Sequence, residues 1–218
     1  DIGACSSRPG SKPVSQQEEL KRLIPAIKLV RKYTKNLFIS VDTFRSEVAI
    51  ACVENGADMI NDISAGENDK NMFDTIIKLN VPYIMMHMKG NPLTMQNKPN
   101  YNDVMSELKE FFNTKIENLN NKGFNKIIID PGFGFGKTLD NNYTILKNLM
   151  QFKEFNLPIL IGASRKSMIY NILNKKPETS LNGTSIINTI GLINGASILR
   201  VHDVEEAMEC IKITNTLK

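Results

Sequence analysis

Residues 126–138 read KIIIDPGFGFGKT, an apolar run that ends in an aspartate and leads into three glycines at alternate positions. The last letters suggest a phosphate-binding loop, but that motif needs a glycine where this chain has Pro131. The dinucleotide fingerprint also fails, because Lys137 or Leu139 replaces its last glycine in the two possible registers. The segment therefore predicts a strand that ends at Asp130, followed by a loop whose glycines allow close backbone approach.

Apolar runs like this one alternate with longer stretches of helical period along the whole chain. The expected strands lie at residues 37–41, 58–62, 81–86, 126–130, 157–162 and 197–201. The first expected helix begins near Ser15 with the capping box SQQE, and a second follows Asp42. Further helices are expected over Phe73 to Leu79, Asp103 to Asn121, Asn142 to Phe152, a stretch before residue 197, and the chain from Val204. This alternation predicts βα units and a parallel sheet.

The composition limits the possible classes of protein. With 218 residues, 41% hydrophobic and 23% charged, residues 1–218 are expected to form one globular domain. A net charge of +4 is too small and too scattered for a nucleic-acid groove. Cys5, Cys52 and Cys210 are too widely spaced to predict a disulfide framework or a metal site, which favours a reducing cytoplasm. Neither a membrane span nor a signal peptide is predicted.

Each expected strand ends in polar side chains. These are Asp42 and Thr43, Asn61 and Asp62, His87, Asp130, Ser164 with Arg165 and Lys166, and Arg200 with His202. Any single aspartate or asparagine there is more often the N-cap of the next helix. Six polar ends together favour a (β/α)8 barrel, in which the carboxyl ends of all strands surround one mouth, over an open doubly wound sheet, which gathers fewer of them.

Seven motifs then suggest a family. They are DIGACSSRPG at residues 1–10, SVDT at 40–43, NDI at 61–63, MHMKGNP at 86–92, DPGFGFGK at 130–137, SRKSMI at 164–169 and RVHDV at 200–204. In order and spacing the chain resembles the dihydropteroate synthase family over almost its whole length. The resemblance implies a (β/α)8 TIM barrel, usually a homodimer. It also implies an enzyme that condenses 6-hydroxymethyl-7,8-dihydropterin pyrophosphate with p-aminobenzoate, giving 7,8-dihydropteroate and pyrophosphate, and that sulfonamides inhibit.

The resemblance also implies roles for individual residues. The pterin would contact Asp42, Asn61, Met86, Asp130 and Lys166. The p-aminobenzoate would lie among Ser7, Arg8, Pro9, Gly134, Phe135 and Ser164. The diphosphate would meet Ser7, Arg8, Arg200 and His202, and the catalytic groups would be Asp130, Lys166, Arg200 and His202. Taken alone, Arg200 is equally consistent with a surface ion pair, and Met86 and Phe135 with ordinary packing.

The chemistry agrees with these roles. A carboxylate such as Asp130 can accept two hydrogen bonds from the guanidine-like edge of a pterin, and the amide of Asn61 can both donate and accept. The planar guanidinium of Arg200 pairs two phosphate oxygens at once. The family resemblance adds Mg²⁺ at the diphosphate. Its asparagine ligand would precede Asp1, so no metal ligand is expected in this chain, and the barrel is expected to lack its first strand and most of its second.

Two alternatives stay open at this stage. A pterin-binding methyltransferase barrel would share the carboxylate and amide ends, but it is not expected to carry SRKSM or the loop with Arg8. A truncated barrel that binds pterin without turnover is the second. In addition, Ala4 and Cys5 stand where the family has a glycine and a glutamate.

Overall fold

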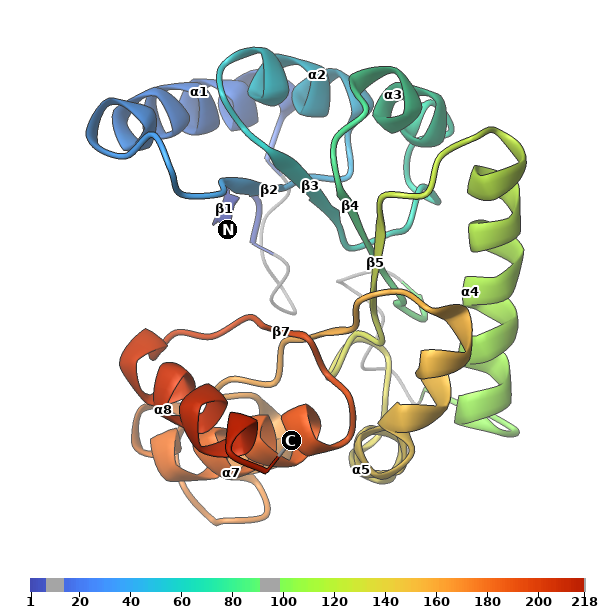
Figure 1. Ribbon diagram of the computed structural model, residues 1–218, viewed down its shortest axis with the longest axis vertical. Helices are drawn as coiled ribbons and strands as arrows, with labels where there is room; N and C mark the ends of the chain where they lie inside the picture. Colours follow the sequence, from blue (N-terminus) through green and yellow to red (C-terminus); the bar gives the residue numbers. More distant parts are fainter. Residues whose placement is uncertain (7–13, 91–98, 218) are drawn as a thin grey trace.

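The computed structural model describes residues 1–6, 14–90 and 99–217 and contains parallel strands that follow one another in chain order (Figure 1). The described strands are β1 (Ile2–Gly3), β2 (Ser40–Asp42), β3 (Met59–Asp62), β4 (Tyr83–Met86), β5 (Ile127–Asp130), β6 (Leu160–Ile161) and β7 (Ile198–Leu199). Strands β1 to β5 form one sheet, β6 pairs with β7, and a bridge between Ile129 and Ile159 joins the two. This is the strand order of a (β/α)8 barrel. In the described residues the barrel is open between β7 and β1.

Helices cover the outer side of this curved row of strands (Figure 1). They are α1 (Gln16–Tyr33), α2 (Ser46–Glu54), α3 (Met72–Leu79), α4 (Val104–Asn121), α5 (Leu139–Lys147), α6 (Ser167–Tyr170), α7 (Leu181–Ile193) and α8 (Val204–Asn215), with 3-10 turns at Leu149–Phe155 and Pro177–Thr179. Among the described helices, none is both long enough and apolar enough to cross a membrane.

The helix ends follow local sequence signals. The hydroxyl of Ser15 accepts a hydrogen bond from the backbone N–H of Glu18 over 3.2 Å and begins α1. The helix predicted over residues 142–152 is wrong in its extent, because α5 ends at Lys147 and a 3-10 turn follows. Asn148 caps this end of α5, because its backbone N–H and its side chain both donate to the carbonyl of Thr144, over 3.1 and 2.8 Å.

Alternation along the strands decides which side chains face the inside of the barrel. Ile84, Ile128 and Leu160 form a small inner cluster, whereas the residue after each of them belongs to the large core beneath the helices. Successive side chains of a strand point to opposite faces. Met86 and Asp130 come two residues after Ile84 and Ile128, so they share the inner face and lie at the carboxyl end of the barrel.

Candidate active site

Polar ends of β2, β3 and β7 meet at the carboxyl end of the barrel. Asp42 and Asn61 lie side by side in the register of β2 and β3. Nη1 of Arg200 lies 3.9 Å from Oδ2 of Asp42. Asp1 joins this group, because its Oδ2 accepts from Nδ2 of Asn61 over 3.1 Å and from Nη1 of Arg200 over 3.3 Å. Sequence reasoning missed Asp1, although its place directly before the β1 stub was the available signal.

The amide of Asn61 has one unsatisfied atom. The residue is 1% exposed, and its Oδ1 is a buried atom without a hydrogen-bond partner among the described residues. Buried polar side-chain atoms are normally paired, so an exception calls for an explanation. Because Asn61 lies at the carboxyl end of β3, where a ligand with an N–H group has access to the barrel mouth, this acceptor is suited to a ligand donor.

Asp130 and Lys166 place opposite charges at the other side of the mouth. Asp130 is 3% exposed, and its Oδ1 accepts from the backbone N–H of Gly132 over 2.7 Å. Burial raises the pKa of Asp130, and the charges of Lys166 and Arg200 oppose that rise. Burial also lowers the pKa of Lys166 to about 8, against the pull of Asp130. Because the pKa values of both groups are shifted, a bound ligand can change the protonation state of Asp130 or Lys166.

An apolar wall adjoins these charges. Met86 and Phe135 belong to one buried cluster with Ile63 and Met88. The ammonium of Lys166 lies 4.5 Å from the centre of the Phe135 ring, within the range of a cation–π interaction. The site therefore combines a flat apolar surface with nearby charged groups, as a flat heteroaromatic ligand with a polar edge requires.

The glycine-rich loop after β5 approaches its neighbours through backbone alone. Gly132, Gly134 and Gly136 have φ values of +70°, +81° and +63°. A side chain at Gly132 would overlap the carbonyl oxygen of His87, and one at Gly136 would overlap that of Lys89. At Gly134 the nearest neighbour of such an atom is Cδ of Lys166, at 3.4 Å. The prediction of close backbone approach is therefore confirmed.

Buried polar side chains hold this loop in place. Nζ of Lys137 donates to the carbonyl oxygens of His87 and Phe135 over 3.2 and 3.1 Å. The Asn142 side chain accepts from the N–H of Gly134 over 2.8 Å, and the hydroxyl of Tyr101 donates to Gly136. Sequence reasoning noted His87 as a strand end but assigned no role to it, to Lys137 or to Tyr101.

The turn after β6 and the end of β7 also meet. Oγ of Ser164 lies 2.9 Å from Nδ1 of His202, and the backbone N–H of His202 donates to the same hydroxyl. The guanidinium of Arg165 instead makes two hydrogen bonds to Asp203, at 2.9 and 2.8 Å. The predicted residues Ser164 and His202 are thus brought together. Ser7, Arg8 and Pro9 lie outside the described residues.

The substituted position in the first loop has a polar neighbour. Nη1 of Arg45 lies 3.6 Å from Sγ of Cys5 and forms an ion pair with the fully buried Glu19. The hydroxyl of Thr43 donates to the same carboxylate over 2.7 Å. Burial raises the pKa of the Cys5 thiol, which keeps it in the neutral form. Glu19 therefore supplies a carboxylate to Arg45 next to Cys5, a position where the family resemblance predicts a glutamate.

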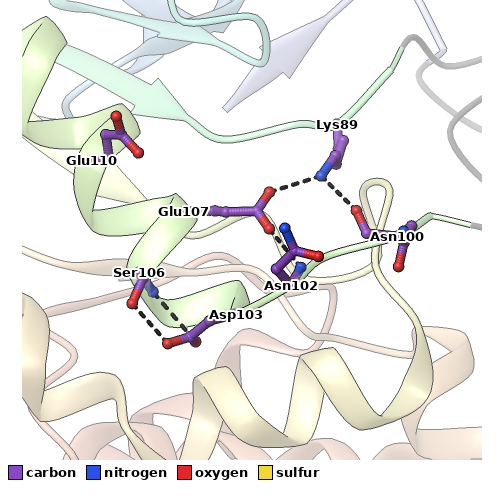
Figure 2. Close-up of a pocket in the computed structure, with 7 residues that line it drawn as sticks. All are labelled: Lys89, Asn100, Asn102, Asp103, Ser106, Glu107 and Glu110. Atoms are coloured by element: carbon purple, nitrogen blue, oxygen red, sulfur yellow. Dashed lines mark hydrogen bonds and ion pairs between the residues drawn. The ribbon is translucent and has the colours of Figure 1, made fainter.

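A cavity of about 370 Å³ lies at the start of α4, and none of the predicted site residues lines it. Figure 2 shows Lys89 pointing toward Glu107 and Asn100, with Asp103 and Glu110 nearby. Its carboxylates repel an anionic substrate, so this cavity is not the diphosphate site.

In the described part of the chain, no group of three or more His, Cys, Asp or Glu side chains could hold a metal ion.

Comparisons with known proteins agree with the geometry. The family model described as "Pterin binding enzyme" matches residues 1–202. The dihydropteroate synthase of Escherichia coli strain K12 is 41% identical over 215 residues, which cover 98% of this chain and 76% of the relative. The chain belongs to the dihydropteroate synthase family of pterin binding enzymes.

Other dihydropteroate synthases give the same result. That of Synechocystis is 40% identical and matches 100% of this chain and 76% of its own length. The structure of the Yersinia pestis dihydropteroate synthase with a sulfonamide drug has a TM-score of 0.95 at 38% identity and covers 99% of this chain and 78% of that one. The Xanthomonas albilineans dihydropteroate synthase with 4-aminobenzoic acid has a TM-score of 0.92 at 36% identity, with coverage of 99% and 77%. The barrel fold predicted from the sequence is therefore confirmed.

Proposed function

We propose that this chain acts as the other members of the dihydropteroate synthase family do, joining the pterinylmethyl group of 6-hydroxymethyl-7,8-dihydropterin pyrophosphate to p-aminobenzoate. The observation that carries the proposal is the set of inner-facing groups at the carboxyl ends of β2, β3 and β5, namely Asp42, Asn61 and Asp130, close to the charges of Lys166 and Arg200. Carboxylate and amide groups match the N–H groups of a pterin edge.

On the pterin side, the buried Asp130 carboxylate would accept hydrogen bonds from the pterin edge. The same negative charge would stabilise the cation that develops on the pterin as the C–O bond to the diphosphate breaks. Met86 would pack against the ring, and Lys166 would contact its polar edge. The arylamine nitrogen then attacks the exocyclic carbon. Because this amine is a neutral nucleophile, the reaction needs no strong general base.

On the diphosphate side, Arg200 and His202 would together balance the charge of the leaving pyrophosphate. The side chain of Arg200 is 28% exposed, so a substrate can reach it. We also propose that Mg²⁺ takes part in the reaction. It is usually bound through substrate phosphates rather than by a cage of protein groups, so it would arrive with the diphosphate. The described residues do not by themselves form a metal site.

The p-aminobenzoate would lie beside Phe135, Gly134 and Ser164, with Ser7, Arg8 and Pro9 from the first loop. Relatives support this part of the proposal, since one solved dihydropteroate synthase holds 4-aminobenzoic acid and another a sulfonamide drug. Sulfonamides would therefore compete with p-aminobenzoate in this protein. We further propose a cytoplasmic location, which the three free cysteines support.

We also propose a homodimer, with a second copy covering the outer face of α7 and α8. Six large apolar side chains of these two helices are exposed, which is more than scattered surface residues explain: Ile186, Ile190, Ile193, Val204, Met208 and Ile213. The exchange Ile190→Lys is expected to give a monomer in sedimentation equilibrium. Leu29→Lys, on the similarly exposed α1, serves as the control. An unchanged dimer in the Ile190 variant would place the interface elsewhere.

The central test of function is a product assay. The protein is incubated with the pterin pyrophosphate, p-aminobenzoate and Mg²⁺, and 7,8-dihydropteroate and pyrophosphate are measured by chromatography. Formation of both in equal amounts is expected. Pterin binding in calorimetry without product would favour a barrel that binds without turnover. Methyl transfer from a methylated pterin would favour a pterin-binding methyltransferase.

A further inference from the structure

One carboxylate oxygen of the mouth serves two of the proposed substrate-binding side chains. Oδ2 of Asp1 accepts from Nδ2 of Asn61 and from Nη1 of Arg200. Asp1 directly precedes β1, whose Gly3 lies opposite Asp42 in the register with β2. The side chain of Asp1 is 22% exposed, so it is largely enclosed by the ends of these strands.

The chemistry of this oxygen decides how the amide of Asn61 is oriented. An ionised carboxylate accepts hydrogen bonds and cannot donate them. It therefore holds the NH₂ group of Asn61 on its own side and leaves Oδ1 on the other. That Oδ1 is the buried atom that has no partner in the described residues. If the amide were reversed, two acceptors would face each other at Asp1, which is unfavourable.

We infer that Asp1 is a positioning residue for pterin recognition, which fixes the amide of Asn61 so that the site presents an acceptor to an N–H group of the pterin. The same oxygen holds Arg200 at the mouth of the barrel. The inference rests on the proposed function and adds a residue to it. It also makes a prediction about selectivity, because a fixed acceptor favours ligands that have a donor at that point and rejects those that have an acceptor.

A purely structural role for Asp1 would have a different signature. If the carboxylate merely attached β1 to its neighbours, its loss would lower the melting temperature and weaken the binding of every ligand alike. A positioning role instead acts through Asn61, so the effect of Asp1 on pterin affinity disappears when Asn61 is absent. This dependence is what a double-mutant cycle measures.

The test is such a cycle in the full chain, with 6-hydroxymethylpterin as the calorimetric probe. In Asp1→Asn the side chain keeps its size but can donate as well as accept, so the amide of Asn61 is no longer held in one orientation. Pterin affinity is expected to fall by about 10-fold. In the Asn61→Ala background the same exchange is expected to cost less than about 2-fold. Asp74→Asn, an exposed carboxylate on α3 that pairs with Lys122, is the control and should change neither value.

A second measurement avoids changing Asn61, in case Asn61→Ala does not fold. The side-chain NH₂ protons of Asn61 are expected to exchange slowly with water in the unmodified protein and measurably faster in Asp1→Asn, with no change in Asp74→Asn. Equal exchange in all three proteins, or losses that add in the cycle, would overturn the inference. These failures are distinct from a failure of the proposed function, which would appear as absent pterin binding by the unmodified protein.

Discussion

Nζ of Lys137 lies 3.0 Å from Nδ1 of His87, and both side chains are buried beneath the glycine-rich loop. Burial lowers the pKa of Lys137 to about 7, and burial with the neighbouring lysine charge lowers the pKa of His87 to about 2. The imidazole is therefore neutral near pH 7 and accepts from the lysine. The pair connects the end of β4 to the loop that carries Phe135.

Replacing Lys137 with methionine keeps most of the apolar stem but removes the donor. The ring nitrogen and carbonyl of His87 and the carbonyl of Phe135 would lose their partner, at about 1–3 kcal/mol for each group left unsatisfied. We expect a lower free energy of unfolding in urea at pH 7. Lys147→Met, on the exposed end of α5, is the control.

The same variant has a predicted pH dependence. The pKa of Lys137 is lower in the folded state than in the unfolded state, so the unfolded chain binds more protons between about pH 7 and 10. The stability of the unmodified protein relative to Lys137→Met should therefore rise as the pH rises through this range. Parallel stability curves would show that Lys137 titrates normally.

Gly123 and Gly132 have similar backbone angles, so substituting each with alanine separates the cost of left-handed backbone strain from the cost of steric overlap. Gly123 has φ +79° and nothing within 4 Å of an added side-chain atom, whereas at Gly132, with φ +70°, that atom would overlap the His87 carbonyl. Gly123→Ala should cost about 1–2 kcal/mol from its left-handed backbone alone. Gly132→Ala should cost at least about 3 kcal/mol, because backbone must also move. Equal losses in denaturant unfolding would contradict this packing of the loop on β4.

Asp42→Asn is expected to increase stability while it weakens pterin binding. Burial raises the pKa of Asp42 to about 6, so keeping it ionised in the folded protein is unfavourable. Because the pKa of Asp42 is higher in the folded than in the unfolded state, this group lowers the free energy of unfolding as the pH rises from about 4 to 6, and the loss reaches its full size above that range. The variant should exceed the unmodified protein by about 1–3 kcal/mol at pH 8, with a smaller difference at pH 4. The same difference at both pH values would exclude this cause.

Arg200→Ala should raise the dissociation constant of pyrophosphate by about 10-fold or more, since a hydrogen bond to a charged group contributes roughly 1.5–3 kcal/mol. Lys109→Ala, which removes a partly exposed ion pair between α4 and Glu154, is the control for net charge. Calorimetric titration with Mg²⁺ present and absent measures both variants. If Arg200→Ala and Lys109→Ala bind pyrophosphate equally well, Arg200 is not a diphosphate ligand.

Asp130→Asn should weaken pterin binding by about 1.5–3 kcal/mol, because the ligand loses a charge-assisted hydrogen bond. Pyrophosphate affinity in the same variant is the internal control and should stay within about 2-fold. A calorimetric titration that finds the pterin affinity unchanged would remove Asp130 from the site.

The sequence predicted the order of the strands and the polar groups at their ends, because alternation and strand ends are local patterns. Strand limits were less accurate. The strand expected from residue 37 begins at Ser40, since Leu37 and Phe38 are 60% and 77% exposed, and an apolar side chain does not reveal whether it is buried. Asp1 and Lys137 were missed for another reason. Their partners are 50 or more residues away, and periodicity indicates the face of a strand but not its contacts.

The close backbone packing at Gly132 and Gly136 limits where mutations that confer resistance to an inhibitor can arise. A ligand bound against this loop contacts its main chain. A side chain at either glycine would overlap a neighbouring backbone carbonyl, so a single substitution there would destabilise the fold before it changed the affinity for the ligand. Mutational freedom is expected to be greater in the first loop, where the family resemblance predicts a glycine and a glutamate at the positions of Ala4 and Cys5. Variants that tolerate an inhibitor of this site should therefore arise in the first loop rather than in the glycine-rich one.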